Sequence, residues 1–412
     1  MPLEPASGEG RDVAFPQSLG KYVPIARLGS GGMAEVFLAV ARGPVGFNKL
    51  AVVKRLRNSD DDTQVAMFLD EARLAARLNH ANVVHTYEVG EAQGKYFIAM
   101  EYLEGQSVHA LIARHKLQAT GLSESLAAYI AAQTLKGLHF AHQLRDFDGT
   151  PLGVVHRDVS PHNLYVTYDG EVKVLDFGVA KTRMNADHTE AGMVKGKIRY
   201  MAPEQLRAGA VDARADVFAL GVVLWELLAR RALFQGDAPS VMARVVAEDA
   251  PLVRTLRAEV SPELEAIVAR ALQRDPGERY SSAEEMRAAL EGFLRGKNEA
   301  FDQELAKVMN DGFAATRDEI RERIKVFLKE LPDGAEGTVP ADFGSTSELP
   351  LLGKGSDSGS PQAPPVTTGA RVASRGPRWS WLLLAIAGAI AGVVVLGRLG
   401  REIAPTSAPT ST

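Results

Sequence analysis

Two acidic residues and one amide lie close together near the middle of the 412-residue chain. Asp158 comes shortly before Asn163 in a polar run, and Asp176 ends a β-like run and is followed by Phe-Gly. Carboxylate and amide oxygens are the ligands that Mg²⁺ prefers, and a carboxylate can also accept the proton of a hydroxyl group. These three side chains could therefore hold Mg²⁺ beside a hydroxyl group that is to be deprotonated.

The same residues belong to two longer patterns. Residues 156–163 read H-R-D-V-S-P-H-N, and residues 176–178 read D-F-G. Together they resemble the catalytic and metal-binding loops of protein kinases. The resemblance implies ATP as phosphate donor, Asp158 as the residue that orients and deprotonates the acceptor, and Asn163 and Asp176 as Mg²⁺ ligands. It also implies an α+β, two-lobed protein kinase fold with a small β-rich lobe and a larger helical lobe.

Composition excludes several other classes of function. The net charge is −4, so the chain has no broad basic field and we expect no nucleic-acid partner. The chain has no cysteine, which excludes disulfides, thiolate metal sites and cysteine nucleophiles. No secretory signal is recognisable at the N-terminus, so the N-terminal part is expected to stay in the cytoplasm.

A glycine-rich turn joins two β-like runs near the N-terminus. Glycine lets a backbone approach phosphate groups closely, although a plain hairpin would look the same from this stretch alone. The kinase resemblance makes the turn a nucleotide-binding loop, with alanine in place of its third glycine. The residues assigned to the nucleotide on this basis are Leu28, Gly29, Ser30, Gly31, Gly32, Met33, Ala34, Glu35 and Val36.

Lys54 lies in an apolar β-like run that follows this turn. A lysine in such a strand is costly to desolvate unless it meets an anion. The resemblance implies that Lys54 binds the α- and β-phosphates and that Glu71, on a helix expected over 63–78, holds it in place. It also implies that the backbone of Glu101 and Leu103 bonds the adenine base.

The polar segment 179–201 lies between the D-F-G motif and an A-P-E motif. A segment of this length inside a domain is typically functional or disordered. By resemblance it is the activation segment of a kinase, and Arg157 would bind a phosphate on it. Its hydroxyl-bearing residues are Thr182, Thr189 and Tyr200, of which Thr189 is the predicted phosphorylation site.

Two positions depart from the family pattern. Ser160 stands where serine/threonine kinases usually have lysine, and Lys197 stands where they usually have threonine. The hypothesis is that Lys197 reaches back to Asp158 and the γ-phosphate and replaces the missing charge as a catalytic residue. The run I-R-Y-M-A-P-E at 198–204 is partly like the tyrosine-kinase form, so the choice between serine/threonine and tyrosine stays open.

Two structural contacts also follow from the resemblance. Asp216 opens an apolar helix and matches the aspartate that braces the catalytic-loop backbone. Arg279, in a late D-P-G-E-R motif, is predicted to form a partly buried ion pair with Glu204.

The C-terminal third begins with two amphipathic stretches that we expect to dock on the large lobe. Residues 379–397 carry no charge and would span roughly 28 Å as a helix, close to the ~30 Å thickness of a bilayer core. The predicted organisation is a disordered leader at 1–20, the kinase domain at 21–296, an amphipathic helical extension at 297–331, a Gly/Ser/Pro-rich linker at 332–378, a transmembrane helix at 379–397 and a short polar tail at 398–412.

The sequence thus predicts a single-pass protein of the bacterial inner membrane with a cytoplasmic kinase domain that acts on protein substrates. It resembles the bacterial eukaryotic-like serine/threonine protein kinases. Gly388 and Gly392 form a G-x-x-x-G pattern, a candidate contact for a homodimer in the bilayer. The alternative is a membrane-tethered pseudokinase scaffold, which Ser160 favours. A small-molecule phosphotransferase is disfavoured because it would need no activation segment.

Overall fold

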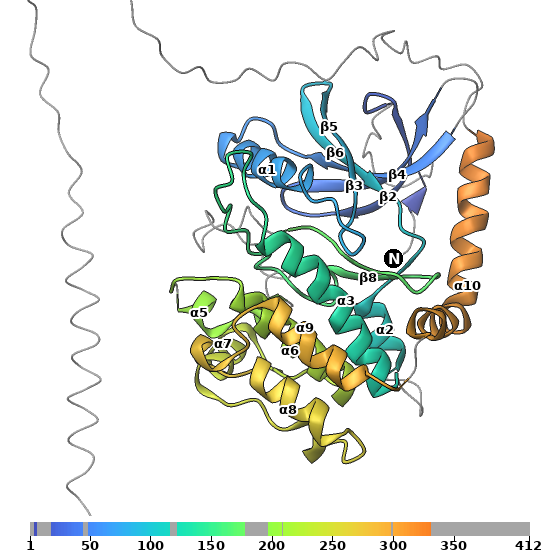
Figure 1. The fold of residues 1–412 in the computed structure, drawn as a ribbon. Helices are drawn as coiled ribbons and strands as arrows, with labels where there is room; N and C mark the ends of the chain where they lie inside the picture. Colours follow the sequence, from blue (N-terminus) through green and yellow to red (C-terminus); the bar gives the residue numbers. More distant parts are fainter. Residues whose placement is uncertain are drawn as a thin grey trace, which may run out of the picture. The chain divides into compact units, whose positions relative to one another are not determined.

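The structure, a computed structural model, describes residues 4–5, 18–43, 48–115, 122–177, 197–207, 209–297 and 300–330. Figure 1 shows a β-rich lobe and a helical lobe, with the long helix α10 alongside them. This arrangement agrees with the two-lobed fold predicted from the sequence.

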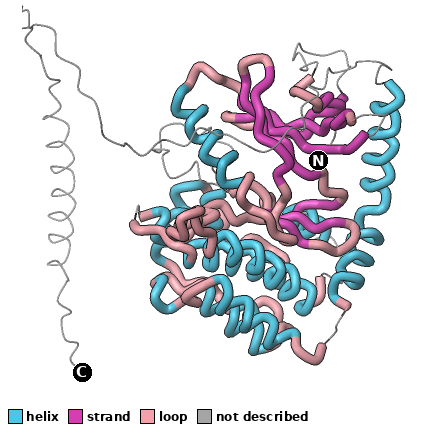
Figure 2. Tube along the Cα trace, turned by 45° about the horizontal axis from the view of Figure 1, so that its top comes forward, coloured by secondary structure: helices cyan, strands magenta, loops and turns pink. Residues whose placement is uncertain are grey.

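The small lobe contains an antiparallel sheet whose described strands run in the order β1-β2-β3-β4-β6-β5. Figure 2 shows the strands in magenta. The strands are β1 (Glu4–Pro5), β2 (Tyr22–Ser30), β3 (Ala34–Arg42), β4 (Asn48–Leu56), β5 (Thr86–Ala92) and β6 (Lys95–Glu101). Val36 pairs with Lys54 between β3 and β4, and Lys54 pairs with Ile98 between β4 and β6. Lys54 therefore lies inside the sheet, one strand away from the glycine turn.

Helix α1 (Asp62–Ala75) packs against this sheet and carries Glu71. The Asp61 side chain accepts hydrogen bonds from backbone N–H groups of the first turn, which caps the helix. Phe68 is fully buried and packs in one cluster with Leu56 of β4. Cap and core contact together fix the rotation of α1.

The large lobe is built on α6, whose residues are buried almost all around the helix, as expected at the centre of a helical core. A short sheet, β7-β8-β9, joins this lobe to the catalytic residues. The elements are β7 (Gly105–Ser107), α2 (Val108–His115), α3 (Glu124–His142), β8 (Leu164–Thr167), β9 (Val172–Val174), η4 (Ile198–Tyr200), α5 (Pro203–Leu206), α6 (Arg214–Ala229), α7 (Ala238–Ala247), η5 (Val253–Thr255), α8 (Pro262–Ala271), η6 (Pro276–Glu278) and α9 (Ala283–Leu294).

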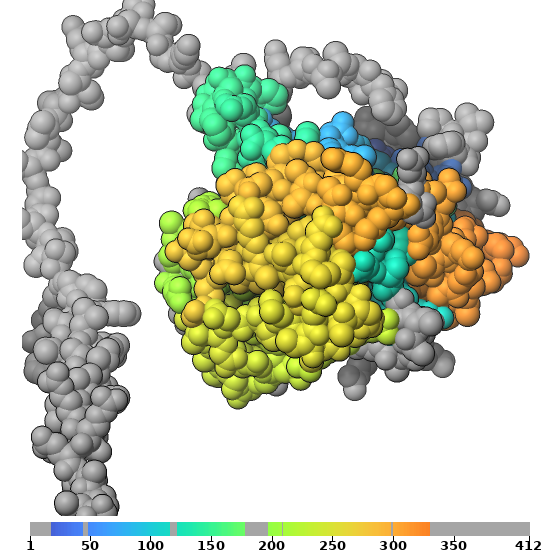
Figure 3. All heavy atoms as spheres, turned by 60° about the horizontal axis from the view of Figure 1, so that its bottom comes forward, coloured from blue at the N-terminus to red at the C-terminus, as the bar shows by residue number. Residues whose placement is uncertain are grey.

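Helix α10 (Phe301–Glu330) replaces the two separate helices expected in this region. Its backbone leaves helical geometry at Phe313 (φ −130°, ψ 22°), so the two expected helices are two halves joined by a kink. Gly312 immediately precedes the kink, and glycine is one of the residues at which helices bend. Figure 3 shows α10 in orange beside the teal segment that contains α2.

Two parts of the predicted leader take part in the fold. Leu19 is fully buried with Tyr22 in the small-lobe core, and Glu4–Pro5 pairs with β2. Because the Leu19 side chain is part of the small-lobe core, the packed domain begins at or before residue 19 and not at residue 21. Within the described residues no helix is both long and apolar enough to cross a membrane. The predicted linker at 332–378, transmembrane helix at 379–397 and tail at 398–412 lie outside the described residues.

Candidate active site

Asp216, at the start of α6, holds the backbone of the catalytic loop. Its buried carboxylate accepts the N–H groups of His156 and Arg157, both at 2.8 Å. Arg157 has φ 62°, a conformation that side-chain-bearing residues rarely adopt, so these bonds stabilise a strained turn. The predicted brace is thus confirmed. A contact that the sequence did not predict adds to it, because His142 Nε2 lies 2.8 Å from Asp216.

The charge of Asp216 persists despite its complete burial. Burial acts to raise the pKa of this carboxyl, but the bond and charge of His142, helped by His156, outweigh it and keep the pKa below its usual value. The carboxylate therefore stays ionised at neutral pH and remains a strong acceptor for the loop N–H groups.

The carboxylate of Asp158 receives two donors on one oxygen. Lys197 Nζ lies 2.7 Å from Asp158 Oδ2, and Asn163 Nδ2 lies 3.0 Å from the same atom. Asn163 Nδ2 also donates to the backbone carbonyl of Asp158 at 2.9 Å. The contact expected between Lys197 and Asp158 is therefore present, and Lys197 comes from a segment remote in sequence.

Asn163 and Asp176 are joined through the backbone, because Leu175 N donates to Asn163 O at 2.8 Å. The Nδ2 group of Asn163 is turned to Asp158, so its Oδ1 is the atom that a cation would use. The side chain of Asp176 is about half exposed, with φ 45°. Its carboxylate and the Asn163 amide oxygen suit Mg²⁺, which is commonly bound by few protein oxygens and completed by water and phosphate.

No cluster of three or more histidine, aspartate or glutamate residues that could enclose a metal ion occurs in the described part of the chain. A cation held by Asn163 and Asp176 could take its other ligands from water and from phosphate oxygens. The residues present fit Mg²⁺ in that role.

Lys54 contacts two acidic residues at the inner end of the cleft. Its Nζ bonds Glu71 Oε1 and lies 3.7 Å from Asp176 Oδ1. Burial would lower the pKa of Lys54, but the charges of Asp176 and Glu71 outweigh it and raise the pKa above its usual value. Lys54 is thus a fully charged donor that faces the residue expected to hold Mg²⁺.

A cavity of about 590 Å³ opens beside Lys54 and Asp176. Of the glycine-turn residues assigned to the nucleotide, it brings together Leu28, Gly29 and Val36. The other assigned residues of the turn, Ser30, Gly31, Gly32, Met33, Ala34 and Glu35, do not line the cavity. The carboxylate of Glu35 is instead bonded to Arg55 at 2.6 Å, so only its backbone could serve a nucleotide.

Glu101 and Leu103 line the same cavity at the connection between the lobes. The Glu101 carboxylate faces away, since it accepts from His85 N at 2.8 Å and from Lys173 Nζ at 3.2 Å. Glu101 N donates to His85 O. Contact of Glu101 with a base would therefore be made through its carbonyl group.

The structure narrows the candidates for phosphorylation. Tyr200 is buried and its hydroxyl donates to Glu226 Oε2 at 2.8 Å, which removes it from the accessible hydroxyl groups. Thr182 and Thr189 lie outside the described residues. Arg157, the predicted phosphate partner, is partly buried, and its backbone N–H is held by Asp216.

Ser160 does not replace the lysine that is missing at its position. The residue is almost completely buried, and its hydroxyl has no hydrogen-bond partner in the described part of the protein. The cation beside Asp158 is supplied by Lys197 alone among the described lysines.

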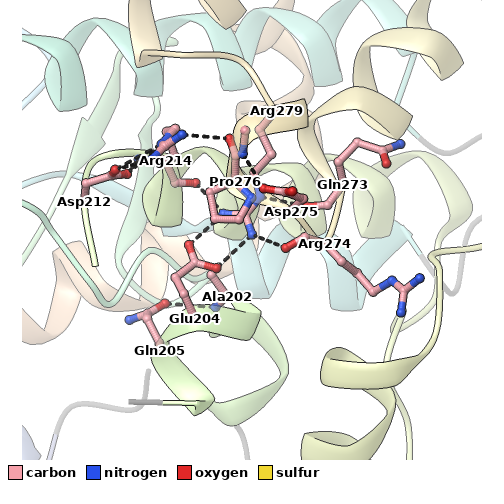
Figure 4. Close-up of polar contacts among 11 residues, drawn as sticks. Ala202, Glu204, Gln205, Asp212, Arg214, Gln273, Arg274, Asp275, Pro276 and Arg279 are labelled. Atoms are coloured by element: carbon pink, nitrogen blue, oxygen red, sulfur yellow. Dashed lines mark hydrogen bonds and ion pairs between the residues drawn. The ribbon is translucent and has the colours of Figure 1, made fainter. Parts of the chain in front are cut away.

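The predicted ion pair of Arg279 and Glu204 is confirmed (Figure 4). The two groups form parallel bonds of 2.7 and 2.8 Å. Arg279 also donates to carbonyl groups at Gln273, Arg274 and Arg214. The pair fixes the A-P-E end of the activation segment to the large lobe.

Sequence reasoning missed one wall of the cavity. Arg317, Ile320 and Arg321 of α10 line it together with the hinge. The amphipathic pattern of this region indicated a buried face, but nothing in the spacing indicated which lobe would cover that face.

The comparisons with known proteins agree with this geometry. Residues 22–290 match the family model of the protein kinase domain. The chain is 47% identical over 286 residues to "Tyrosine-protein kinase MasK" of Myxococcus xanthus, with 68% of this chain and 44% of the relative covered. It is 36% identical to "Serine/threonine-protein kinase pkn3" of the same species, with 68% of this chain and 50% of pkn3 covered.

A third relative is "Serine/threonine-protein kinase PrkC" of Bacillus subtilis, 33% identical, with 66% of this chain and 40% of PrkC covered. The chain thus spans half or less of the length of these curated relatives. Among solved structures, the PknI kinase domain of Mycobacterium tuberculosis matches with a TM-score of 0.51 and 25% identity, covering 68% of this chain and 99% of that domain.

Proposed function

This chain belongs to the protein kinase family, and we propose that it transfers the γ-phosphate of ATP to serine or threonine hydroxyl groups of proteins. One observation carries the proposal: Lys54 and Asp176 line a single cavity, Glu71 bonds Lys54, and a backbone bond joins the Asp176 loop to the catalytic loop at Asn163. A charged lysine and hard oxygen ligands beside a base are the groups that phosphoryl transfer requires.

In the proposed reaction the acceptor hydroxyl donates a hydrogen bond to Asp158. The oxygen of the acceptor hydroxyl attacks the γ-phosphorus, and the hydroxyl proton passes to Asp158. The bond from the γ-phosphorus to the β-phosphate oxygen breaks, and ADP leaves. Lys54 holds the α- and β-phosphates, and Asn163 and Asp176 would hold Mg²⁺. Bound Mg²⁺ would neutralise charge on the phosphate oxygens. The protein contributes positioning and charge complementarity rather than a covalent intermediate.

Lys197 is proposed as the residue that contacts both Asp158 and the γ-phosphate. It approaches from the end of the activation segment, so its position depends on how that segment is folded. Phosphorylation of Thr189, with Arg157 as its partner, is the proposed means of ordering the segment.

Transfer to tyrosine is the second candidate. It is favoured by the partial tyrosine-kinase form of residues 198–204, by Ser160, and by the name of the 47% identical Myxococcus xanthus relative, a tyrosine-protein kinase. Serine and threonine are preferred because the pkn3 and PrkC relatives are named for them. A pseudokinase is opposed by the presence of Lys54, Glu71, Asp158, Asn163 and Asp176.

The test is phosphate incorporation by the purified full chain with labelled ATP and Mg²⁺, followed by mapping of the modified residues. We expect incorporation that EDTA abolishes, with phosphothreonine at Thr189. Predominant phosphotyrosine would overturn the proposed acceptor. Nucleotide binding without any incorporation would identify a pseudokinase.

We also propose that residues 379–397 anchor the chain in the bacterial inner membrane, with the kinase domain in the cytoplasm. The proposal rests on the uncharged stretch and the arginines that flank it. The full chain should float with liposomes in a density gradient at high salt, and a chain that ends at residue 378 should not. Equal flotation, or none for the full chain, would contradict the anchor.

A further inference from the structure

Helix α10 contacts both lobes, one with each half. In its first half Leu305 and Met309 are fully buried in the large-lobe core. In its second half Ile324 is buried in a cluster with Ile25 and Leu38 of the small-lobe sheet. The sequence had predicted docking on the large lobe, and this is correct for the first half only. The kink at Phe313 lets one helix follow two surfaces.

The first half is fixed to the hairpin that connects the catalytic loop to Asp176. Asn310 Nδ2 donates to Tyr168 O at 2.8 Å in the turn of that hairpin. At Gly170, with φ 85°, a Cβ atom would lie 2.0 Å from Asp302 O, so only glycine permits this approach. The first half of α10 therefore has little freedom to move relative to the active-site loops. Just past the kink, the guanidinium of Arg317 lies over the Tyr168 ring at 4.9 Å.

The second half crosses the hinge at the mouth of the cavity. Ile320 packs in one cluster with Leu28 of the cavity roof and Tyr102 of the hinge. Arg321 bonds the hinge residue Glu104 at 2.8 Å. Since the phosphate-binding groups lie at the Lys54 end, the part of a nucleotide nearest α10 is its base and ribose. The buried Nε of Arg317 has no hydrogen-bond partner in the described part of the chain. It is a candidate donor to the base or ribose of a bound nucleotide.

We propose that α10 is a component of the nucleotide site: it supplies the outer wall of the cavity for base and ribose, and its docking on the small lobe increases nucleotide affinity. The inference rests on the proposed function, in that the cavity holds a nucleotide. The contacts of α10 join the cavity roof, the hinge and the large lobe. A nucleotide that fills the cavity should therefore in turn favour the state in which α10 is docked on the small lobe. Such linkage is reciprocal by thermodynamic necessity.

The first experiment compares two variants of the full chain by stopped-flow dissociation of a fluorescent ADP analogue. Ile324→Asp places a charge in the contact with the small lobe, and Ile324 itself does not line the cavity. Val326→Asp adds the same charge at a position that is half exposed. If undocking leaves about one tenth of molecules competent, Ile324→Asp should weaken binding about tenfold. Val326→Asp should bind like the wild type.

A second experiment measures docking of α10 by chemical labelling, without a variant that disrupts its contact with the small lobe. The chain has no cysteine, so Phe327→Cys introduces the only thiol. Phe327 packs on the small lobe and does not line the cavity. Saturating ADP with Mg²⁺ should slow its reaction with a maleimide several-fold, with the thermal melting temperature recorded as a check of folding.

The outcomes separate the two proposals. If the ADP analogue does not bind the wild type, the proposed function itself fails. If it binds the wild type, Ile324→Asp and Val326→Asp equally, or if ADP leaves the labelling rate of Phe327→Cys unchanged, α10 is only a structural extension. Tighter binding by Ile324→Asp would make α10 an obstruction rather than a wall, and would also overturn the inference.

Discussion

Replacing Lys197 with alanine should lower the rate of phosphotransfer by about 100- to 1000-fold, the usual cost of removing one positioned donor from a developing charge. Lys197 Nζ lies 2.7 Å from Asp158 Oδ2, close to the point where the acceptor and the γ-phosphate must meet. Ser160, which occupies the usual lysine position, is buried and brings no charge to this point. No other described lysine bonds Asp158.

The effect should fall on kcat and leave nucleotide affinity unchanged, because Lys197 does not line the nucleotide cavity. Initial rates of phosphate incorporation into a protein substrate, with binding of a fluorescent ADP analogue measured alongside, separate the two quantities. Lys197→Arg keeps the charge and should retain more activity than Lys197→Gln, which has similar length but no charge.

A merely structural lysine would behave differently. If alanine, glutamine and arginine at position 197 all gave the wild-type rate, the exchange between positions 160 and 197 would have no catalytic meaning. If all three lost activity together with thermal stability, the lysine would act through folding of the segment and not through charge.

The contact between Lys197 and Asp158 shows how much of the active site can be predicted from the sequence. Motif spacing located Asp158, Asn163 and Asp176 because short loops between paired strands leave little freedom for their placement. Lys197 was predicted as the partner of Asp158 because position 160 lacks the usual lysine and position 197 has a lysine in place of the usual threonine. Charge compensation is readable in sequence when both positions belong to motifs of known geometry.

Other features were beyond the sequence for physical reasons. The apolar face of α10 shows that Ile320 and Ile324 must be covered, but periodicity does not identify the covering surface. The contact of His142 with Asp216 joins residues of two helices that are far apart in the sequence, and no pattern marks His142 as the partner of Asp216. The burial of Ser160 depends on how the loop is packed, whereas its polar character alone would place it in solvent.

Replacing Glu204 with alanine should destabilise the kinase domain by about 3–5 kcal/mol, because it leaves a buried arginine without its counter-charge. The side chain of Arg279 is fully buried, and Glu204 provides its two carboxylate bonds. The three carbonyl groups that also accept from Arg279 cannot neutralise its charge. Urea unfolding followed by intrinsic fluorescence should show an earlier midpoint.

Asp249→Ala is the matched control for this prediction. It removes a carboxylate that lies 2.8 Å from Arg274, in an ion pair whose partners are well exposed. Exposed pairs contribute about 0–1 kcal/mol, so its midpoint should stay near that of the wild type. The double variant Glu204→Met with Arg279→Met should recover part of the loss, since it removes the buried charge as well. Equal shifts for Glu204→Ala and Asp249→Ala would mean that the buried pair adds no more stability than a surface contact.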